Sequence, residues 1–159
     1  MSEQIFVPAV AYRDRGAAMD FLEQAFGFEV SLLVTDADGE IGHAEMTFAG
    51  ARIAISGEWE GAALIGPAVI RSPATVGGAN TGFLRIQMPG GIDAHCERAR
   101  AAGATITQEP GDQFYGERNY RCLDPEGHVW TFGQPVANPP TIAQMEAASG
   151  LKLTAGKEG

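Results

Sequence analysis

The stretch that decides the fold is GDQFYGERNYRCLDPEGHVWTFG, residues 111–133. Its pattern predicts an aromatic, polar loop and then a β-hairpin with strands over residues 119–123 and 129–133. The turn is Asp124-Pro125-Glu126-Gly127, where proline fixes φ at the second position and glycine supplies a positive φ near the end. Polar and aromatic groups on a loop beside a rigid hairpin are a common way to build a small-molecule site. We therefore expect this stretch to border one.

The hairpin ends a pattern that occurs twice in the chain. The first copy predicts a strand, a helix and three strands over residues 5–12, 15–26, 28–35, 40–48 and 52–56. The second copy predicts a strand, a helix and a strand over residues 81–88, 92–102 and 104–108, followed by the hairpin. Glycines register the copies at a nearly constant separation, 76 residues for Gly27 and Gly103 and 77 for Gly50 and Gly127. A near-constant separation indicates a duplicated βαβββ module, with one residue inserted between helix and hairpin.

The repeat sets the expected domain organisation. We assign residues 4–57 to the first module, 58–80 to a connection, 81–135 to the second module, and 136–159 to a C-terminal helix and tail. The connection is rich in Gly, Ala and Pro, and loops of this length usually link modules or cover a site. Thr141 and Gln144 are spaced as a capping box, which predicts that the last helix begins there.

Composition narrows the function classes. The 159 residues carry a formal net charge of −9, which disfavours binding to nucleic acid or anionic lipid and suits a cationic ligand. No apolar run approaches the roughly 20 residues that span a bilayer. The first residues lack the basic and apolar regions of a signal peptide, and two cysteines do not make a disulfide framework. We expect a cytoplasmic protein with no membrane or nucleic-acid partner.

Three features together resemble the vicinal oxygen chelate superfamily: the paired βαβββ units, the Asp-Pro-x-Gly-His turn at residues 124–128, and the stretches over residues 12–28 and 115–132. That superfamily includes glyoxalase I, extradiol dioxygenases, fosfomycin-modifying enzymes and bleomycin-resistance proteins. The resemblance implies an α+β fold in which each module forms a curved mixed sheet and the two sheets enclose a ligand cavity. In many members a second subunit completes the cavity, so a homodimer is also implied.

Metal-dependent members of that superfamily carry His or Glu on the first and last strand of each module. Alignment from the helix start and the repeat offset put these positions at Val7, Ala54, Phe83 and Thr131. Zn, Fe, Mn and Ni need imidazole, carboxylate or thiolate donors, and a shift of one residue at any position restores none. We therefore expect no metal and no cofactor, and glyoxalase I and extradiol dioxygenase activities are disfavoured. A rearranged site using His43 and Glu45 is the alternative.

Strand parity assigns the side chains to faces. Ala44, Met46 and Phe48 form the apolar set expected under the helix, which leaves His43 and Glu45 on the cavity side. The repeat offset makes Tyr120 the equivalent of His43. The expected ligand-binding residues are Val7, His43, Glu45, Arg52, Phe83, Arg85, Tyr115, Arg118, Tyr120 and Trp59.

Several of these side chains have two interpretations. His43 with Glu45 fits a general base and its orienting group, or a structural pair. Arg118 fits a ligand carboxylate, or holds its own loop through Glu117 or Asp112. Tyr120 fits ligand stacking or packing inside the fold.

The remaining aromatic and sulfur residues have simpler interpretations. Trp59 lies on the connection and is expected to act as a lid, whereas Trp130 is expected in the core. His128 is expected to be structural, and Cys122 to be a packed thiol. His95 and Cys96 have no partners visible in the sequence.

The leading hypothesis is a bleomycin-resistance-like protein that captures a small organic ligand in a cavity without metal. Its effect would be resistance by sequestration rather than catalysis. The alternative is an enzyme of the same superfamily, either a lyase or isomerase that uses His43 and Glu45 or a dioxygenase-like enzyme with a rearranged metal site. A third hypothesis is a partner module, with the connection and the C-terminal helix as its interface.

Overall fold

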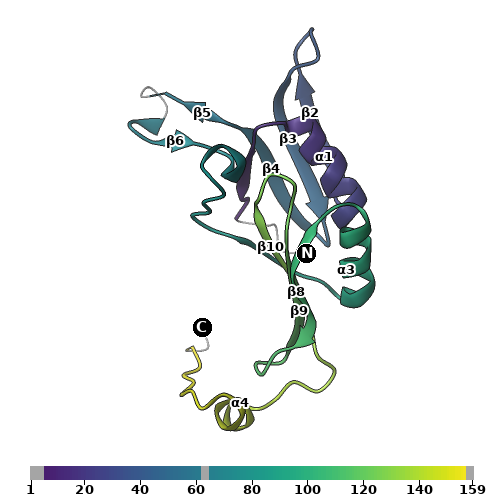
Figure 1. Cartoon of the computed structure of the whole chain (residues 1–159), viewed down its shortest axis with the longest axis vertical. Helices are drawn as coiled ribbons and strands as arrows, with labels where there is room; N and C mark the ends of the chain where they lie inside the picture. Colours follow the sequence, from purple (N-terminus) through teal and green to yellow (C-terminus); the bar gives the residue numbers. More distant parts are fainter. Residues whose placement is uncertain (1–5, 62–64, 157–159) are drawn as a thin grey trace.

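The structure is a computed structural model that describes residues 6–61 and 65–156. Residue 5 of the predicted first strand, residues 62–64 of the connection and the last three residues of the predicted tail lie outside this range. The described chain is α+β, with two open four-stranded sheets and few helices (Figure 1). The predicted fold class is confirmed.

The first half forms one mixed sheet with the strand order β1-β4-β3-β2. Its elements are β1 (Ala9–Tyr12), α1 (Arg15–Phe21), the π-helical turn η1 (Leu22–Phe26), β2 (Glu29–Thr35), β3 (Ile41–Phe48) and β4 (Ala51–Gly57). Strand β1 is parallel to β4 and lies at the edge, which is the position expected for a strand preceded by proline.

The second half repeats this arrangement with the order β7-β10-β9-β8. Its elements are β7 (Leu84–Gln87), α3 (Ile92–Ala101), β8 (Thr105–Asp112), β9 (Glu117–Leu123) and β10 (Val129–Pro135). Strand β7 is shorter than predicted, and residues 81–83 precede it. Strand β8 is longer than predicted, because irregular pairing between Gln108 and Gly111 accommodates Pro110 within the strand.

Local sequence signals account for the helix ends. The Asp14 side chain accepts a hydrogen bond from the amide of Ala17 at 2.9 Å and begins α1. Gly27 ends η1 with φ at 79°, in the left-handed region that favours glycine. Thr141 and Gln144 form the predicted capping box of α4 (Ile142–Ser149), which has no buried residue and lies apart from both sheets (Figure 1).

The helical segment of the first module, α1 with η1, and the helix of the second module, α3, lie on the same side of the molecule. There α3 packs against η1 (Figure 1). Aromatic side chains from both halves fill the space beneath them. The Phe26 ring lies 4.7 Å from Phe132 and 5.2 Å from Trp130, centroid to centroid. Trp130 and Phe132 are fully buried, as the predicted core position of Trp130 requires. The two modules therefore share one core.

His95 on α3 is a polar member of this core. Its Nε2 is 2.9 Å from the carbonyl oxygen of Phe26, so this nitrogen carries the proton and donates it. Its Nδ1 then accepts from the hydroxyl of Tyr120 at 2.7 Å. Burial lowers the pKa of His95, which keeps the ring neutral. No local pattern of residues indicates these partners, because they come from two distant segments.

The Asp124–Gly127 turn joins the second sheet to the first module. The buried carboxylate of Asp124 accepts hydrogen bonds from Tyr12 Oη at 2.7 Å and from Trp130 Nε1 at 3.0 Å. Its other oxygen accepts the amides of Glu126 and His128, both at 3.0 Å. Burial, together with the adjacent Asp124 carboxylate, raises the pKa of Tyr12 well above its ordinary value, so the hydroxyl stays protonated.

Glu126 extends the same connection to two further segments. Its carboxylate accepts the amides of Arg13 and Asp14 at 2.7 and 2.9 Å, just before α1 begins. It also accepts the hydroxyl of Ser72 in the connection between the modules. One four-residue turn therefore holds β1, the start of α1 and the connection in place.

The repeat contains one extra residue, but its position differs from the prediction. Ala54 pairs with Glu45 in the first sheet, and Thr131 pairs with Arg121 in the second. Equivalent residues of the last strands, Ala54 on β4 and Thr131 on β10, are thus 77 positions apart in the sequence. Equivalent residues of the strands before them, Glu45 on β3 and Arg121 on β9, are 76 positions apart. The extra residue of this pair lies in the turn after Leu123, not between helix and hairpin.

The connection between the modules is partly ordered as secondary structure. It contains the short hairpin β5 (Trp59–Glu60) and β6 (Val69–Ile70) and the turn η2 (Pro73–Thr75). Arg71 holds the hairpin through an ion pair with Glu60 at 2.6 Å. Across the described residues, every helix is too short or too polar to cross a membrane.

Replacing Asp124 by Asn tests the role of the turn. The amide nitrogen would face the indole N–H of Trp130, leaving one buried donor without an acceptor. We expect a loss of about 2–3 kcal/mol in the free energy of unfolding, measured by urea denaturation. Asp36→Asn is the matched control, because Asp36 makes the same turn contacts to Asp38 and Glu40 at an exposed site. Equal effects of the two substitutions would contradict the account.

Candidate functional site

Each sheet has one face under the helices and an opposite face, here called the open face. On the open face of the first sheet, His43 Nε2 lies 3.1 Å from Glu45 Oε1. Arg52 Nη1 lies 3.1 Å from the other oxygen of Glu45. The hydrogen bond from His43 and the charge of Arg52 hold the pKa of Glu45 below its ordinary value. Three predicted site residues therefore form one contact chain.

His43 also lines a cavity of about 450 Å³ at the end of this face. Trp59 and Arg15 contribute to the same cavity, and Ala9 and Ala54 form part of its apolar wall. The predicted lid residue Trp59 is thus placed beside His43, although the two are far apart in sequence.

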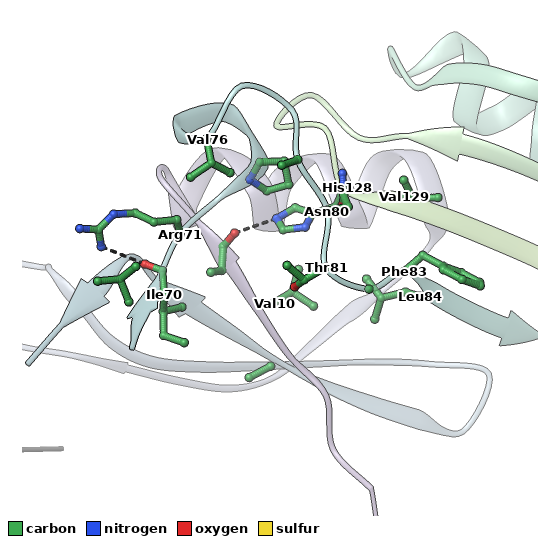
Figure 2. A pocket seen from close by; sticks show the side chains of 16 residues that line it. Val10, Ile70, Arg71, Val76, Asn80, Thr81, Phe83, Leu84, His128 and Val129 are labelled. Carbon is green, nitrogen blue, oxygen red and sulfur yellow. Dashed lines mark hydrogen bonds between the residues drawn. The ribbon is translucent and has the colours of Figure 1, made fainter. Parts of the chain in front are cut away.

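A larger cavity, about 560 Å³, lies between the first strands of the two modules. Figure 2 shows Val10 of β1 on one side of this cavity and Phe83 and Leu84 on the other side. The chain from Arg71 to Thr81 passes over the cavity. Most lining side chains are apolar, and they include Val69, Ile70, Pro73, Val76 and Val129. The polar groups are few, which is typical of sites for organic molecules.

His128 has a structural role at this cavity. Its Nε2 donates to the carbonyl oxygen of Ala11 at 2.7 Å and so links the end of the turn before β10 to β1 (Figure 2). Ala9 lines both the larger and the smaller cavity. The two cavities therefore border the same residue of β1, whose side chain is a single methyl group.

The open face of the second sheet is polar. Thr131 on β10 is paired in register with Arg85 on β7 and with Arg121 on β9. Arg121 Nε donates to Thr131 Oγ1 at 3.2 Å. Arg85 was a predicted site residue, whereas Arg121 was missed because the repeat offset placed the wrong β9 residues on this face.

Glu117 is a second residue of this face that the sequence did not single out as a ligand-facing group. Its buried carboxylate accepts hydrogen bonds from Arg85, Gln87 and Asn119. Burial opposes ionisation, but these three donors outweigh it and lower the pKa of Glu117. A Cβ atom at Gly133 would lie 2.5 Å from this carboxyl group, so only glycine leaves room for it. The signal available in the sequence was an acidic residue, Glu117, followed two positions later by Asn119 on the same face of the strand.

The prediction that Tyr120 faces the cavity is wrong. Tyr120 is fully buried under the helices, where its hydroxyl bonds to His95. The reason is the position of the inserted residue: Tyr120 is the equivalent of Ala44, not of His43. Packing inside the fold, the second interpretation of Tyr120, is the correct one.

Arg118 also points away from the open face. It pairs with Asp93 of α3 at 2.7 Å and with Asp112 of β8 at 2.9 Å. It holds its own loop and the adjacent helix, as one of its two interpretations proposed, and contact with a ligand in the cavity is not supported.

The other predicted site residues lie near these groups. Tyr115 is 40% exposed, bonds to Asn119 through its hydroxyl at 2.9 Å, and has Arg85 6.0 Å from its ring centre. Phe83 is 64% exposed and lines the larger cavity. Val7 is half-buried just before β1. Burial raises the pKa of Cys122 to about 12, in keeping with a packed thiol.

The residues at the four ligand positions do not fit a metal ion. The register places Ala9 beside Ala54 and Arg85 beside Thr131, which adds no carboxylate, imidazole or thiolate to the set. Within the described part of the chain, Cys96, Glu97 and Glu109 are close enough to share an ion. However, Arg100 already pairs with both acids, and burial raises the pKa of the Cys96 thiol.

Comparison with known proteins gives the same picture of the fold. Mb0911c of Mycobacterium bovis is 30% identical over 135 residues, covering 84% of this chain and 85% of that protein. TioX from Micromonospora sp. ML1 is 28% identical with a TM-score of 0.63, over 86% of this chain and 100% of TioX. The fosfomycin resistance protein FosX from Listeria monocytogenes is 18% identical with a TM-score of 0.56, over 91% and 99% of the chains, and shares the fold.

A family model decides the assignment. Residues 4–132 match the family described as Glyoxalase/Bleomycin resistance protein/Dioxygenase superfamily. This range covers both βαβββ halves up to the end of the shared aromatic core. The chain belongs to the Glyoxalase/Bleomycin resistance protein/Dioxygenase superfamily.

Proposed function

We propose that this protein binds a small organic molecule in the cavities that Ala9 borders and acts by capturing it, without a metal ion. The larger cavity carries the proposal, because it is mostly apolar and is framed by both modules and their connection. Its volume of about 560 Å³ falls within the range of drug-sized ligands. Capture of a toxic molecule in such a site would give resistance by sequestration.

Filling the cavity at Ala9 tests this proposal. Ala9→Leu adds three carbon atoms at a residue that lines both cavities, and the exposed position tolerates the larger side chain. With the neutral aromatic probe naphthalene-2-carboxamide, we expect saturable binding by calorimetry and about tenfold weaker binding in the variant. Ala147→Leu, on the exposed surface of α4, should bind as the unmodified protein does. No saturable binding to the unmodified protein would contradict the proposal.

A second function is favoured by the contact between His43 and Glu45. With Nε2 donating its proton to Glu45, Nδ1 of His43 is the basic nitrogen and can accept a proton from a substrate. The adjacent cavity, lined by Trp59 and Arg15, offers space for that substrate. This arrangement fits an isomerase or lyase step in which the abstracted proton returns to substrate or solvent.

His43→Gln tests the enzyme alternative on any substrate found by a turnover screen. Removal of a general base typically lowers the rate by about 10²–10⁴-fold, so kcat should fall by this factor. Arg100→Gln, on the far surface of α3, should leave kcat unchanged. Unchanged turnover in the His43 variant would exclude the mechanism.

We also propose that the protein is a homodimer in which a second copy covers β2. This edge strand exposes apolar side chains on both faces, with Val30, Leu32, Leu33 and Val34 each between 41% and 48% exposed. Residues 29–35 contain no Lys or Pro, the residues that commonly protect an exposed edge. A strand of this kind is normally covered by a partner.

Sedimentation analysis tests the dimer. The unmodified protein should sediment as a dimer, and a variant with Leu33→Lys and Val34→Lys as a monomer, because charge would be buried at the contact. Leu151→Lys is the control, since Leu151 is 60% exposed on the C-terminal tail. A monomeric unmodified protein would overturn the proposal.

A further inference from the structure

We propose that Arg85 and Arg121, on the open face of the second sheet, bind the oxyanion group of the organic ligand. Carboxylate, sulfonate and phosphate groups share the required chemistry. This inference deepens the proposed function, on which it rests, by naming the class of ligand as an amphiphilic organic anion. It reverses the expectation from net charge, which favoured a cation.

Sheet register places the two guanidinium groups around one side chain. Arg85, Thr131 and Arg121 lie side by side on β7, β10 and β9. Neighbouring strands are about 4.8 Å apart, so the Cα atoms of the two arginines are roughly 10 Å apart across Thr131. Both side chains are long enough to reach an anion held above the threonine. Thr131 is 3% exposed as a residue, and its hydroxyl already accepts a hydrogen bond from Arg121 Nε.

Arg85 is a fixed cation. Glu117 contacts its guanidinium from a buried position and is itself held by Gln87 and Asn119. The carboxylate occupies the space above Gly133, so it approaches Arg85 from the next row of the sheet and does not lie over Thr131. Glu117 therefore orients Arg85 and offsets its charge, while the side chain stays 48% exposed.

Arg121 is the cation whose charge is not offset. Among residues 6–61 and 65–156, no carboxylate oxygen lies within 4.0 Å of its guanidinium, and Thr131 is its hydrogen-bond partner. The side chain is exposed on the open face. The row therefore carries one net positive charge in a protein whose formal net charge is −9. Arginine binds oxyanions through paired, charge-assisted hydrogen bonds, which suits such a position.

The apolar part of the ligand has a place beside this row. Val129 lies two residues before Thr131 on β10, so its side chain lies on the same face about 7 Å away. Phe83 lies two residues before Arg85, just before β7 begins. Both line the larger cavity (Figure 2). One molecule with an aromatic body and an acidic group can therefore fill the end of the cavity and reach the arginines.

The test compares two probes of nearly equal shape, naphthalene-2-carboxylate and its neutral carboxamide, by calorimetry at low salt. One charge-assisted contact should make the carboxylate bind about tenfold tighter or more. Arg121→Gln and Arg85→Gln should each remove most of this preference. Arg100→Gln lowers the net charge equally on α3 and should leave the preference intact.

Equal binding of the two probes would overturn the oxyanion site and leave the proposed cavity function standing. Binding of neither probe would contradict the cavity function, and inorganic phosphate then decides the oxyanion site alone. In NMR spectra of the unmodified protein, the Nε–H signals of Arg85 and Arg121 should shift saturably with phosphate, unlike that of Arg100. Equal, non-saturating shifts of all three would overturn the inference.

Discussion

Hydrogen bonds to the buried carboxylate of Asp124 join the two modules. The carboxylate accepts hydrogen bonds from Tyr12 of the first module, from Trp130 of the second, and from two amides of its own turn. A buried carboxylate is costly unless donors surround it, and here four donors do. The turn is thereby fixed against β1, and Glu126 of the same turn holds the start of α1 and the connection.

The attachment of the Asp124–Gly127 turn to β1 determines which faces of the two sheets stay open to a ligand. The helices of both modules pack together over one aromatic core, so their sheets turn the opposite faces outward (Figure 1). The first strands of the modules then lie on either side of the apolar cavity, with the connection passing over it. Polar side chains are left on the open faces, where they pair with one another: His43 with Glu45 along β3 in one sheet, and Arg85 of β7 with Glu117 of β9 in the other.

Hydrophobic periodicity and turn chemistry correctly predicted the local features of the fold. The helix ends at Asp14 and Gly27, the succession of helix and strands in each module and the core position of Trp130 follow from local signals and alternation. Sequence-based prediction failed where one residue changes strand parity, because a single insertion moves every side chain of a strand to the other face. For that reason Tyr120 was predicted on the cavity side although it is buried, and Arg121 was missed although it lies on the open face. The partners of His95 and Glu117 depend on contacts between segments far apart in the sequence, which no local pattern encodes.

Metal content distinguishes our proposal, capture of an organic ligand without a metal ion, from metal-dependent chemistry in the same cavity. The purified protein is incubated in turn with Zn, Fe, Mn and Ni salts, freed of unbound ions, and analysed for metal per chain. Ala9 with Ala54 and Arg85 with Thr131, which the register pairs on the first and last strands, offer no suitable donors, and neither do the predicted positions Val7 and Phe83. We therefore expect far less than one equivalent of every metal. Retention of about one equivalent of any of them, lost on replacing His43 or Glu45, would contradict the proposal.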